Sequence, residues 1–361
     1  MSLVAKIKST LGLGDKTVLG VDIGLSQIKV CELKKSGSSY KVAGYASVDL
    51  PEGALIEDDI QKPEEISEAF AVALTRLGSS IDNYCLGLSG PNTVARRLQL
   101  AGGSDEEIED QVSWEAEQYL PFDAEDSVIS YHNYGSNEGG GVDVLIAAAR
   151  ADIIEMFKEL VDKENKKKVK IVDLGVTAVT NVFEHVLLDK ISSDESSTIF
   201  LDIGAQKTHF IIYRGGAIYF AKEINVGGVM ITEEVQRQMG VNYEEAENLK
   251  IFGDNEGNLP EDIVEIIEDV LESFFAELKK TIDFYISSTS DDSLKDVYIT
   301  GGAAQTPGIL DGIAEALDRE VHVFNPFEKI SFDKKKFSEE ELNDIAFRGV
   351  ASIGLGMRSG E

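Results

Sequence analysis

A short strand-and-turn segment occurs twice in this chain, and it constrains the fold more than any other feature. Val21-Asp22-Ile23-Gly24-Leu25-Ser26 returns as Leu201-Asp202-Ile203-Gly204-Ala205-Gln206, 180 positions later (202 − 22). In both copies an apolar run leads into the turn and a second β-rich run follows it, at 18–23 and 28–33 and again at 198–203 and 208–213. Two such runs joined by a short turn with glycine indicate a β-hairpin. We therefore expect two lobes built on the same plan.

The residues of these turns suit a bound nucleotide. A turn glycine lets backbone N–H groups approach a phosphate, and an aspartate at the end of the preceding strand can hold a metal-bound water. A single Asp-x-Gly is more often only a turn. Two copies in equivalent strand contexts favour a site for a nucleoside triphosphate with magnesium.

A third segment supports this interpretation. Val297-Tyr298-Ile299-Thr300-Gly301-Gly302-Ala303-Ala304 is an apolar strand that enters a Gly-Gly turn, and Thr306-Pro307-Gly308-Ile309 then opens a helix. Two Asp-Gly hairpins followed by a strand, a Gly-Gly turn and a helix resemble the actin-like ATPase superfamily of actin, sugar kinases and heat-shock ATPases. The resemblance implies an α/β fold of two lobes, each with an RNase H-like mixed sheet.

Composition narrows the classes of partner and cofactor. The net charge of −31, from 65 acidic and 34 basic residues, would repel phosphate backbones, so nucleic acid is excluded as a partner. The two cysteines and four histidines are scattered, which indicates neither a disulfide framework nor a zinc site and fits a reducing cytoplasm. No run of 18 apolar residues spans a membrane. Residues 3–11 carry one apolar helical face, which either docks on the protein itself or rests on a membrane or a partner.

Three further segments resemble the PilM family of type IV pilus assembly proteins, relatives of the division protein FtsA. They are 116–122 (AEQYLPF), 227–232 (GGVMIT) and 244–250 (EEAENLK). The resemblance covers nearly the whole chain and adds an FtsA-type inserted subdomain. The expected division is 1–82, first lobe; 83–170, inserted α/β subdomain; 171–197, the rest of the first lobe with a crossing helix; 198–240, second lobe; 241–296, its helical part; 297–340, its nucleoside-binding turn; and 341–361, a helix returning to the first lobe.

The resemblance also assigns residues to an ATP (or ADP) and Mg²⁺ site. The first phosphate hairpin has Asp22, Gly24, Ser26 and Lys29, and the second has Asp202, Gly204, Gln206 and Thr208, with Asp22 and Asp202 next to the metal. Gly227 and Gly228 form a further turn. Glu247 and Lys250 line the ribose and base, although a solvated helical pair explains the same spacing. Gly301, Gly302 and Ala303 close the nucleotide pocket.

One departure from the family pattern concerns hydrolysis. The family usually has a glutamate that orients the attacking water where this chain has Gly175, directly after Val172-Asp173-Leu174. Asp173 lies on the wrong side of the strand to replace it. We therefore expect very weak or absent ATPase activity, and we expect Gly175→Glu to increase it if this residue is the missing piece.

The resemblance implies a cytoplasmic platform held at the inner membrane by a partner. The partner is the N-terminal tail of a PilN-like bitopic membrane protein, while contacts with pilus motor ATPases and self-association stay open. Trp114, Tyr119, Leu120 and Phe122 would hold the tail in a groove against the first lobe, or would instead fill the core of the inserted subdomain. A small-molecule kinase and an FtsA-like filament-forming tether are the alternatives. The kinase lacks an evident catalytic base, and the tether lacks an amphipathic C-terminal helix.

Overall fold

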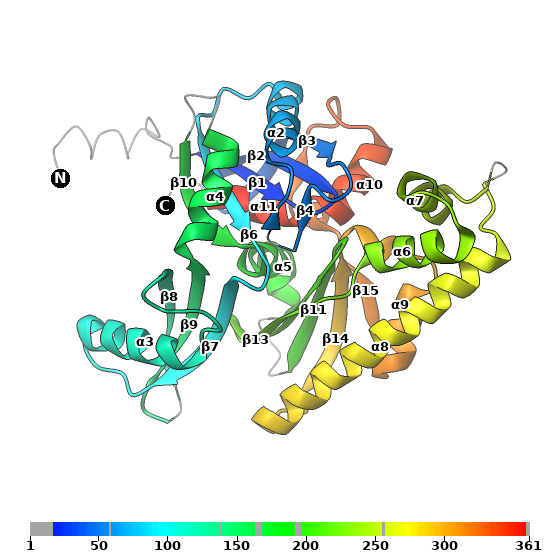
Figure 1. Ribbon diagram of the computed structural model, residues 1–361. Helices are drawn as coiled ribbons and strands as arrows, with labels where there is room; N and C mark the ends of the chain where they lie inside the picture. The colour runs from blue at the N-terminus through cyan, green and yellow to red at the C-terminus, as the bar shows by residue number, and fades with distance from the viewer. Residues whose placement is uncertain are drawn as a thin grey trace.

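The computed structural model describes residues 17–57, 59–137, 139–162, 168–191, 196–254 and 257–358. The apolar face expected at residues 3–11 lies outside these ranges. The described chain forms two large mixed sheets, a separate three-stranded sheet and the helices around them (Figure 1). None of the helices in the described ranges is both long enough and apolar enough to cross a membrane.

The first large sheet begins with the first predicted hairpin. Strands β1 (Leu19–Ile23), β2 (Gln27–Ser36) and β3 (Ser39–Asp49) are antiparallel neighbours. Strands β6 (Asn83–Leu88) and β10 (Lys168–Leu174) add to β1 in parallel, and β16 (Ser331–Phe332) pairs with β3. The order is β10-β6-β1-β2-β3-β16.

The second large sheet repeats this arrangement. Strands β11 (Ser197–Ile203), β12 (Thr208–Arg214) and β13 (Ala217–Ile224) are antiparallel, and β14 (Leu294–Thr300) and β15 (Val321–Val323) add to β11 in parallel. The two sheets have the same strand order and the same pattern of parallel and antiparallel pairs. The order β13-β12-β11-β14-β15 corresponds to β3-β2-β1-β6-β10 in the first sheet. The duplication expected from the repeated hairpin is thus a duplication of five strands.

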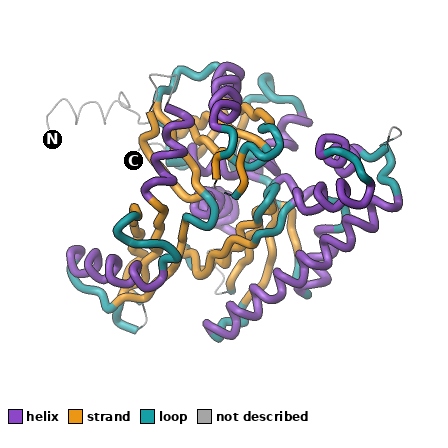
Figure 2. The backbone as a smooth tube through the Cα atoms, viewed as in Figure 1, coloured by secondary structure: helices purple, strands orange, loops and turns teal. Residues whose placement is uncertain are grey.

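Helices cover both sheets on both faces (Figure 2). Helices α2 (Pro63–Leu77) and α4 (Ala151–Asp162) share a core with the first sheet, and α6 (Gly228–Met239), α7 (Tyr243–Phe252), α8 (Glu261–Thr289) and α9 (Ile309–Leu317) share one with the second. Helix α5 (Gly175–Ile191) lies between the two sheets, where Val179 and Phe183 pack with residues of both. This shared core joins the lobes.

Helices α10 (Glu339–Arg348) and α11 (Val350–Gly356) bring the chain back to the first lobe. Helix α11 packs so closely against α5 and β1 that backbone atoms are in contact. A Cβ added to Gly20 would lie 2.0 Å from the Ser352 carbonyl oxygen, and one added to Gly354 would lie 1.9 Å from that of Ala178. Glycine is therefore required at both contacts.

The inserted unit is shorter than the range 83–170 expected from the sequence. Strands β6 and β10 and helix α4 belong to the first lobe, because β6 pairs with β1 and β10 pairs with β6. What stands apart is residues 93–150, which we call the insert. It consists of β7 (Thr93–Leu100), α3 (Asp105–Tyr119), β8 (Ser127–Ser136) and β9 (Val142–Arg150), with sheet order β7-β9-β8.

The insert rests against the second lobe. The Arg97 guanidinium stacks 3.6 Å from the centre of the Tyr219 ring, and the Ile218 N–H donates to the Tyr134 hydroxyl at 3.2 Å. Ile218 and Tyr219 both belong to β13, the edge strand of the second sheet. The insert therefore covers this strand edge (Figure 1).

Candidate functional site

The two predicted hairpin turns have matching geometry. The Gly24 N–H donates to the Gln27 carbonyl at 3.0 Å, and the Gly204 N–H donates to the Lys207 carbonyl at 2.9 Å. In both hairpins the aspartate stands directly opposite the residue seven positions later, Lys29 in the first and His209 in the second. Each aspartate therefore faces a basic side chain across its own hairpin.

These facing residues form ion pairs. The Lys29 ammonium nitrogen lies 3.0 Å from Asp22 Oδ2, and His209 Nδ1 lies 3.2 Å from Asp202 Oδ2. The sequence analysis named Lys29 but not His209. The repeat itself contained the missing signal, because His209 follows Lys29 by the same 180 positions (209 − 29).

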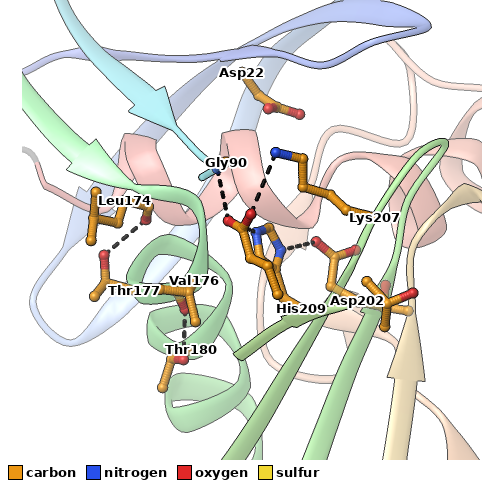
Figure 3. A network of polar contacts seen from close by, with 12 residues as sticks. Asp22, Gly90, Leu174, Val176, Thr177, Thr180, Asp202, Lys207 and His209 are labelled. Carbon is orange, nitrogen blue, oxygen red and sulfur yellow. Dashed lines mark hydrogen bonds and ion pairs between the residues drawn. The ribbon is translucent and has the colours of Figure 1, made fainter. Parts of the chain in front are cut away.

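His209 has a second carboxylate neighbour that the sequence analysis also missed. Glu223 Oε1 lies 3.3 Å from His209 Nε2 and accepts a hydrogen bond of 3.0 Å from the Gly90 N–H, while Glu223 Oε2 lies 3.4 Å from the Lys207 ammonium nitrogen. Figure 3 shows this network. Gly90 follows β6 in the first lobe, so the Gly90–Glu223 bond links the lobes.

The network keeps its members charged. Burial alone would lower the pKa of His209, but the hydrogen bonds and charges of Asp202 and Glu223 outweigh it and raise that pKa to about 10. Burial would raise the pKa of Glu223, but His209, Lys207 and the Gly90 N–H lower it to about 2. At neutral pH, His209 is therefore an imidazolium between two carboxylates.

Gly175 lies against this network, and a side chain there would require Ser89 to move. A Cβ added to Gly175 would lie 2.2 Å from Ser89 Oγ and 3.1 Å from His209 Cε1. The expectation that Gly175→Glu increases ATPase activity stays a prediction, because a side chain there requires the Ser89 hydroxyl to move and His209 to shift by a few tenths of an ångström. Asp173, which the sequence analysis set aside, accepts a hydrogen bond of 2.6 Å from the Thr177 hydroxyl and lies 3.3 Å from Arg358 Nε.

Glu247 and Lys250 lie beside the Gly227-Gly228 turn. The Lys250 ammonium nitrogen is 2.6 Å from Glu247 Oε2, 2.8 Å from Thr232 Oγ1 and 3.2 Å from the Gly228 carbonyl oxygen. Burial lowers the pKa of Lys250, against the opposing effect of Glu247. The pair is therefore tied into the start of α6 and differs from a freely solvated helical pair.

The Gly301-Gly302-Ala303 turn lies beside the Gly227-Gly228 turn. Gly301 has a φ of +96°, and a Cβ there would lie 2.3 Å from the Ile203 carbonyl oxygen. A Cβ on Gly228 would lie 3.2 Å from Ala303 Cβ, and one on Gly302 would lie 3.5 Å from Arg348. A pocket beside these turns is lined in part by Ile203, Gly227, Gly228 and Ala303. Arg348 is a cation that the sequence analysis missed.

Three other predicted residues have different surroundings. The buried Thr208 hydroxyl donates to the Val226 carbonyl at 2.8 Å, so it holds the loop before α6. Gln206 Oε1 is buried and has no hydrogen-bond partner within the part of the chain that the structure describes. Ser26 is exposed, and its carbonyl accepts the Leu50 N–H at 2.8 Å.

The predicted partner-binding residues differ in how far they are exposed on the insert. The core of the insert includes Ile108, Val112 and, at its margin, Leu120. Trp114 is 62% exposed and Tyr119 is 42% exposed, with the Tyr119 ring 4.0 Å from the Arg96 guanidinium, so these two do not fill that core. Phe122 is half-buried. Helix α3 ends at Tyr119 because Leu120 precedes Pro121 and is extended.

A pocket lies where the insert leaves the first lobe, and we call it the insert pocket. It is lined by Ile56, Glu57, Asp59, Pro91, Asn92 and Ile153. Ile56 and Asp59 belong to the small hairpin of β4 (Leu55–Ile56) and β5 (Asp59–Ile60). Trp114, Tyr119, Leu120 and Phe122 are not among its lining residues. Tyr119 nevertheless packs on Arg96, four residues beyond Asn92 and thus about 13 Å along β7.

The pKa shifts predict how stability depends on pH. The His209 pKa is raised from its ordinary 6.5 to about 10, so its stabilising effect is complete below pH 6.5 and is lost as pH rises through 10. The Glu223 pKa is lowered from 4.5 to about 2, so its effect is present above pH 4.5 and is lost as pH falls towards 2. His209→Gln should therefore destabilise the protein most between pH 4.5 and 6.5, by about 3–5 kcal/mol, since it leaves buried carboxylates unpaired.

Urea unfolding across this pH range measures the effect. Arg237→Gln is the control, because Arg237 is exposed and pairs with Glu234 on the surface of α6. It should change stability little at any pH. A His209→Gln effect that is equally small, or that does not shrink towards pH 10, contradicts a buried imidazolium.

Comparisons with known proteins agree with the fold and identify the family. The protein-family model described as "Type IV pilus assembly protein PilM" matches residues 20–360. A solved structure described as a PilM-PilN type IV pilus biogenesis complex is similar with a TM-score of 0.83 and 24% identity, over 95% of this chain and 98% of that one. The ethanolamine utilization protein EutJ from Carboxydothermus hydrogenoformans is similar with a TM-score of 0.56 and 15% identity, over 99% of both chains.

The predicted actin-like ATPase fold is confirmed by these similarities and by the duplicated sheets. Because the family model covers nearly the whole chain, the protein belongs to the PilM family of type IV pilus assembly proteins.

Proposed function

We propose that this protein binds ATP or ADP with Mg²⁺ between its two hairpins and serves as a platform in type IV pilus assembly. Nucleotide binding is supported above all by the pair of equivalent turns, each with a close-packed glycine and an aspartate. The Gly228 and Ala303 turns, with Lys250 and Arg348, supply a second set of groups for the nucleoside.

The chain's own residues fit a nucleotide with a divalent cation. Asp22 and Asp202 offer hard oxygen ligands of the kind Mg²⁺ prefers. Gln206 Oε1 is a buried acceptor with no partner among the described residues, so a bound water or ligand donor would satisfy it. The cation would supply charge neutralisation at the phosphates, while the protein's role is to position them.

Charge balance explains why the cation is needed. The three acids Asp22, Asp202 and Glu223 are paired with the three bases Lys29, Lys207 and His209. Phosphates can gain these bases only if the carboxylates find another cation. Mg²⁺ bound by Asp22 or Asp202 would release Lys29 or His209 towards the phosphates.

We infer that hydrolysis is slow or absent. Gly175 carries no water-orienting group, and His209 is held between carboxylates as an imidazolium, which cannot accept a proton. A phosphate-release assay on the purified protein tests this directly. Turnover in the range of ~1 s⁻¹ or faster would show that another residue activates the water.

We further propose that the protein holds the N-terminal cytoplasmic tail of a PilN-like membrane protein and is thereby attached peripherally to the inner membrane. Family membership and the similarity to a PilM-PilN complex support this partner. The insert pocket supports a binding site for the tail at this position. Its lining combines the apolar Ile56, Pro91 and Ile153 with the acidic Glu57 and Asp59. Ile56 is 53% exposed, which leaves it accessible to a peptide.

The surface around the insert pocket extends towards the end of α3. Tyr119 packs on Arg96 of β7, and Phe122 follows it by three residues, so we propose that an extended peptide leaving the pocket reaches both. Trp114 is five residues before Tyr119 and thus about 140° away around the helix. A single extended peptide would therefore use Tyr119 and Phe122 rather than all three aromatic residues.

The nucleotide proposal predicts strong Mg²⁺ dependence. ATP affinity measured by calorimetry should fall at least ~10-fold when Mg²⁺ is removed, and Asp202→Asn should produce a loss of similar size, because a charged ligand group is removed. Asp311→Asn, an exposed change in α9, is the matched control and should bind as the unmodified protein does. Equal and negligible binding with and without Mg²⁺ would reject the nucleotide site.

The partner proposal predicts which surface residues matter. Ile56→Ser, Tyr119→Ala and Phe122→Ala should each weaken binding of a synthetic PilN-like tail peptide by about 10-fold, since each removes an apolar anchor. ATP binding and the melting temperature should stay nearly unchanged. Phe252→Ala is the control, because Phe252 is an equally apolar side chain, 68% exposed, at the end of α7.

Fluorescence anisotropy with labelled peptide provides the measurement. If Ile56→Ser binds normally while the α3 variants do not, the tail lies on the end of α3 and outside the insert pocket. If all three variants bind normally, the tail binds elsewhere on the protein.

A further inference from the structure

Glu223 places a negative charge where a nucleotide-binding site needs positive charge. Its carboxylate is surrounded by three donors: the Gly90 N–H at 3.0 Å, His209 Nε2 at 3.3 Å and the Lys207 ammonium nitrogen at 3.4 Å. Both carboxylate oxygens are engaged. A backbone N–H and two cationic side chains that converge on one point form the usual surroundings of a bound oxyanion.

The backbone of the three donor residues is set by the fold and does not depend on Glu223. Lys207 and His209 belong to the second hairpin, where strand pairing and the Gly204 turn set their backbone. Gly90 has a φ of +123°, a conformation that favours glycine, and its carbonyl accepts both the N–H and the hydroxyl of Thr93 at 2.9 Å. His209 is additionally held by Asp202. The backbone around the three donors would therefore stay in place if the Glu223 side chain moved away.

We propose that Gly90, Lys207 and His209 form a phosphate site, and that the Glu223 carboxylate is its internal occupant when no ligand is bound. This inference rests on the proposed nucleotide function and refines it. The ligand is a phosphate group with free oxygens, either the terminal phosphate of a nucleoside triphosphate or free inorganic phosphate. Such a group bears more charge than the single carboxylate, so it matches the Lys207 ammonium, and it has more oxygens to accept from the three donors.

An internal occupant changes which nucleotide binds better. A terminal phosphate must displace Glu223 before it can reach the donors, so its apparent affinity is reduced by the fraction of time that Glu223 occupies the site. A nucleoside diphosphate lacks the third phosphate that would be placed there, so its affinity is unaffected. The Glu223 carboxylate thus reduces the difference between triphosphate and diphosphate affinities. When the site holds no ligand, the Glu223 carboxylate also keeps its hydrogen bond from the Gly90 N–H, which links the two lobes.

Glu223→Gln tests the proposal with a side chain of the same size. Glutamine can still accept the Gly90 N–H but has no charge to hold Lys207 and His209, so it competes less. In calorimetry with Mg²⁺ present, we expect ATP and inorganic phosphate to bind about 10-fold more tightly to the variant, with ADP changed less than about 2-fold. Glu277→Gln is the matched control: it removes the same charge from the second lobe, where Glu277 pairs with Lys222.

The possible results separate this inference from the proposed function. If nucleotides bind but Glu223→Gln changes ATP and ADP equally, or not at all, the phosphate site is rejected while nucleotide binding stands. If neither protein binds a nucleotide but the variant gains affinity for inorganic phosphate, the nucleotide function fails while the phosphate site stands. If ATP gains and inorganic phosphate does not, the site requires the tethered terminal phosphate.

A second variant covers the case in which Glu223→Gln does not fold. Lys207→Met removes one donor and keeps the length of the side chain. It should weaken ATP binding about 10-fold and leave ADP binding unchanged. An equal loss for both nucleotides would place Lys207 at the inner phosphates and overturn the assignment.

Discussion

Antiparallel pairing across each hairpin places the turn aspartate opposite the residue seven positions later, and the chemistry of the site follows from that register. In the first hairpin the facing residue is Lys29, and in the second it is His209. Because the register of a hairpin follows from its turn, a change of one residue in either turn would move these bases to the other face of the sheet. The Gly24 and Gly204 turns therefore determine the charge pattern between the lobes as well as the path of the backbone.

This pattern has a structural cost that the surrounding residues offset. An imidazolium and two carboxylates are buried together, which is stable only if every group has partners of opposite charge or hydrogen bonds. Glu223 and Asp202 are the oppositely charged partners of His209. Lys207 and the Gly90 N–H are the partners of Glu223. Gly175 contributes by the absence of a side chain, since any Cβ there would displace His209 or Ser89.

Sequence reasoning reached the parts of the molecule that are local or repeated. The doubled hairpin and the Gly301 turn are visible as short-range patterns, and together with the family resemblance they predicted the fold. Strand β7 was missed because Arg96 and Arg97 interrupt its apolar pattern, and β8 because one of its faces is exposed. Glu223 and Gly90 are 133 positions apart, so no spacing rule could join them. The limits of the insert were misplaced because β6 looks the same in sequence whichever sheet it joins.

The glycine contacts of α11 have a consequence for how this chain folds. Gly20 of β1 and Ser352 of α11 are 332 positions apart (352 − 20), yet they meet at backbone distance in the middle of the first lobe. Contacts of such long range slow folding, because a long loop must close before they form. During synthesis, β1, β2 and β3 must wait for α11 with their inner face open to water. The second lobe, whose sheet lies within residues 197–323, can complete its own core earlier. The lobe that begins first is thus the one that finishes last, and it is the one we expect to need a chaperone.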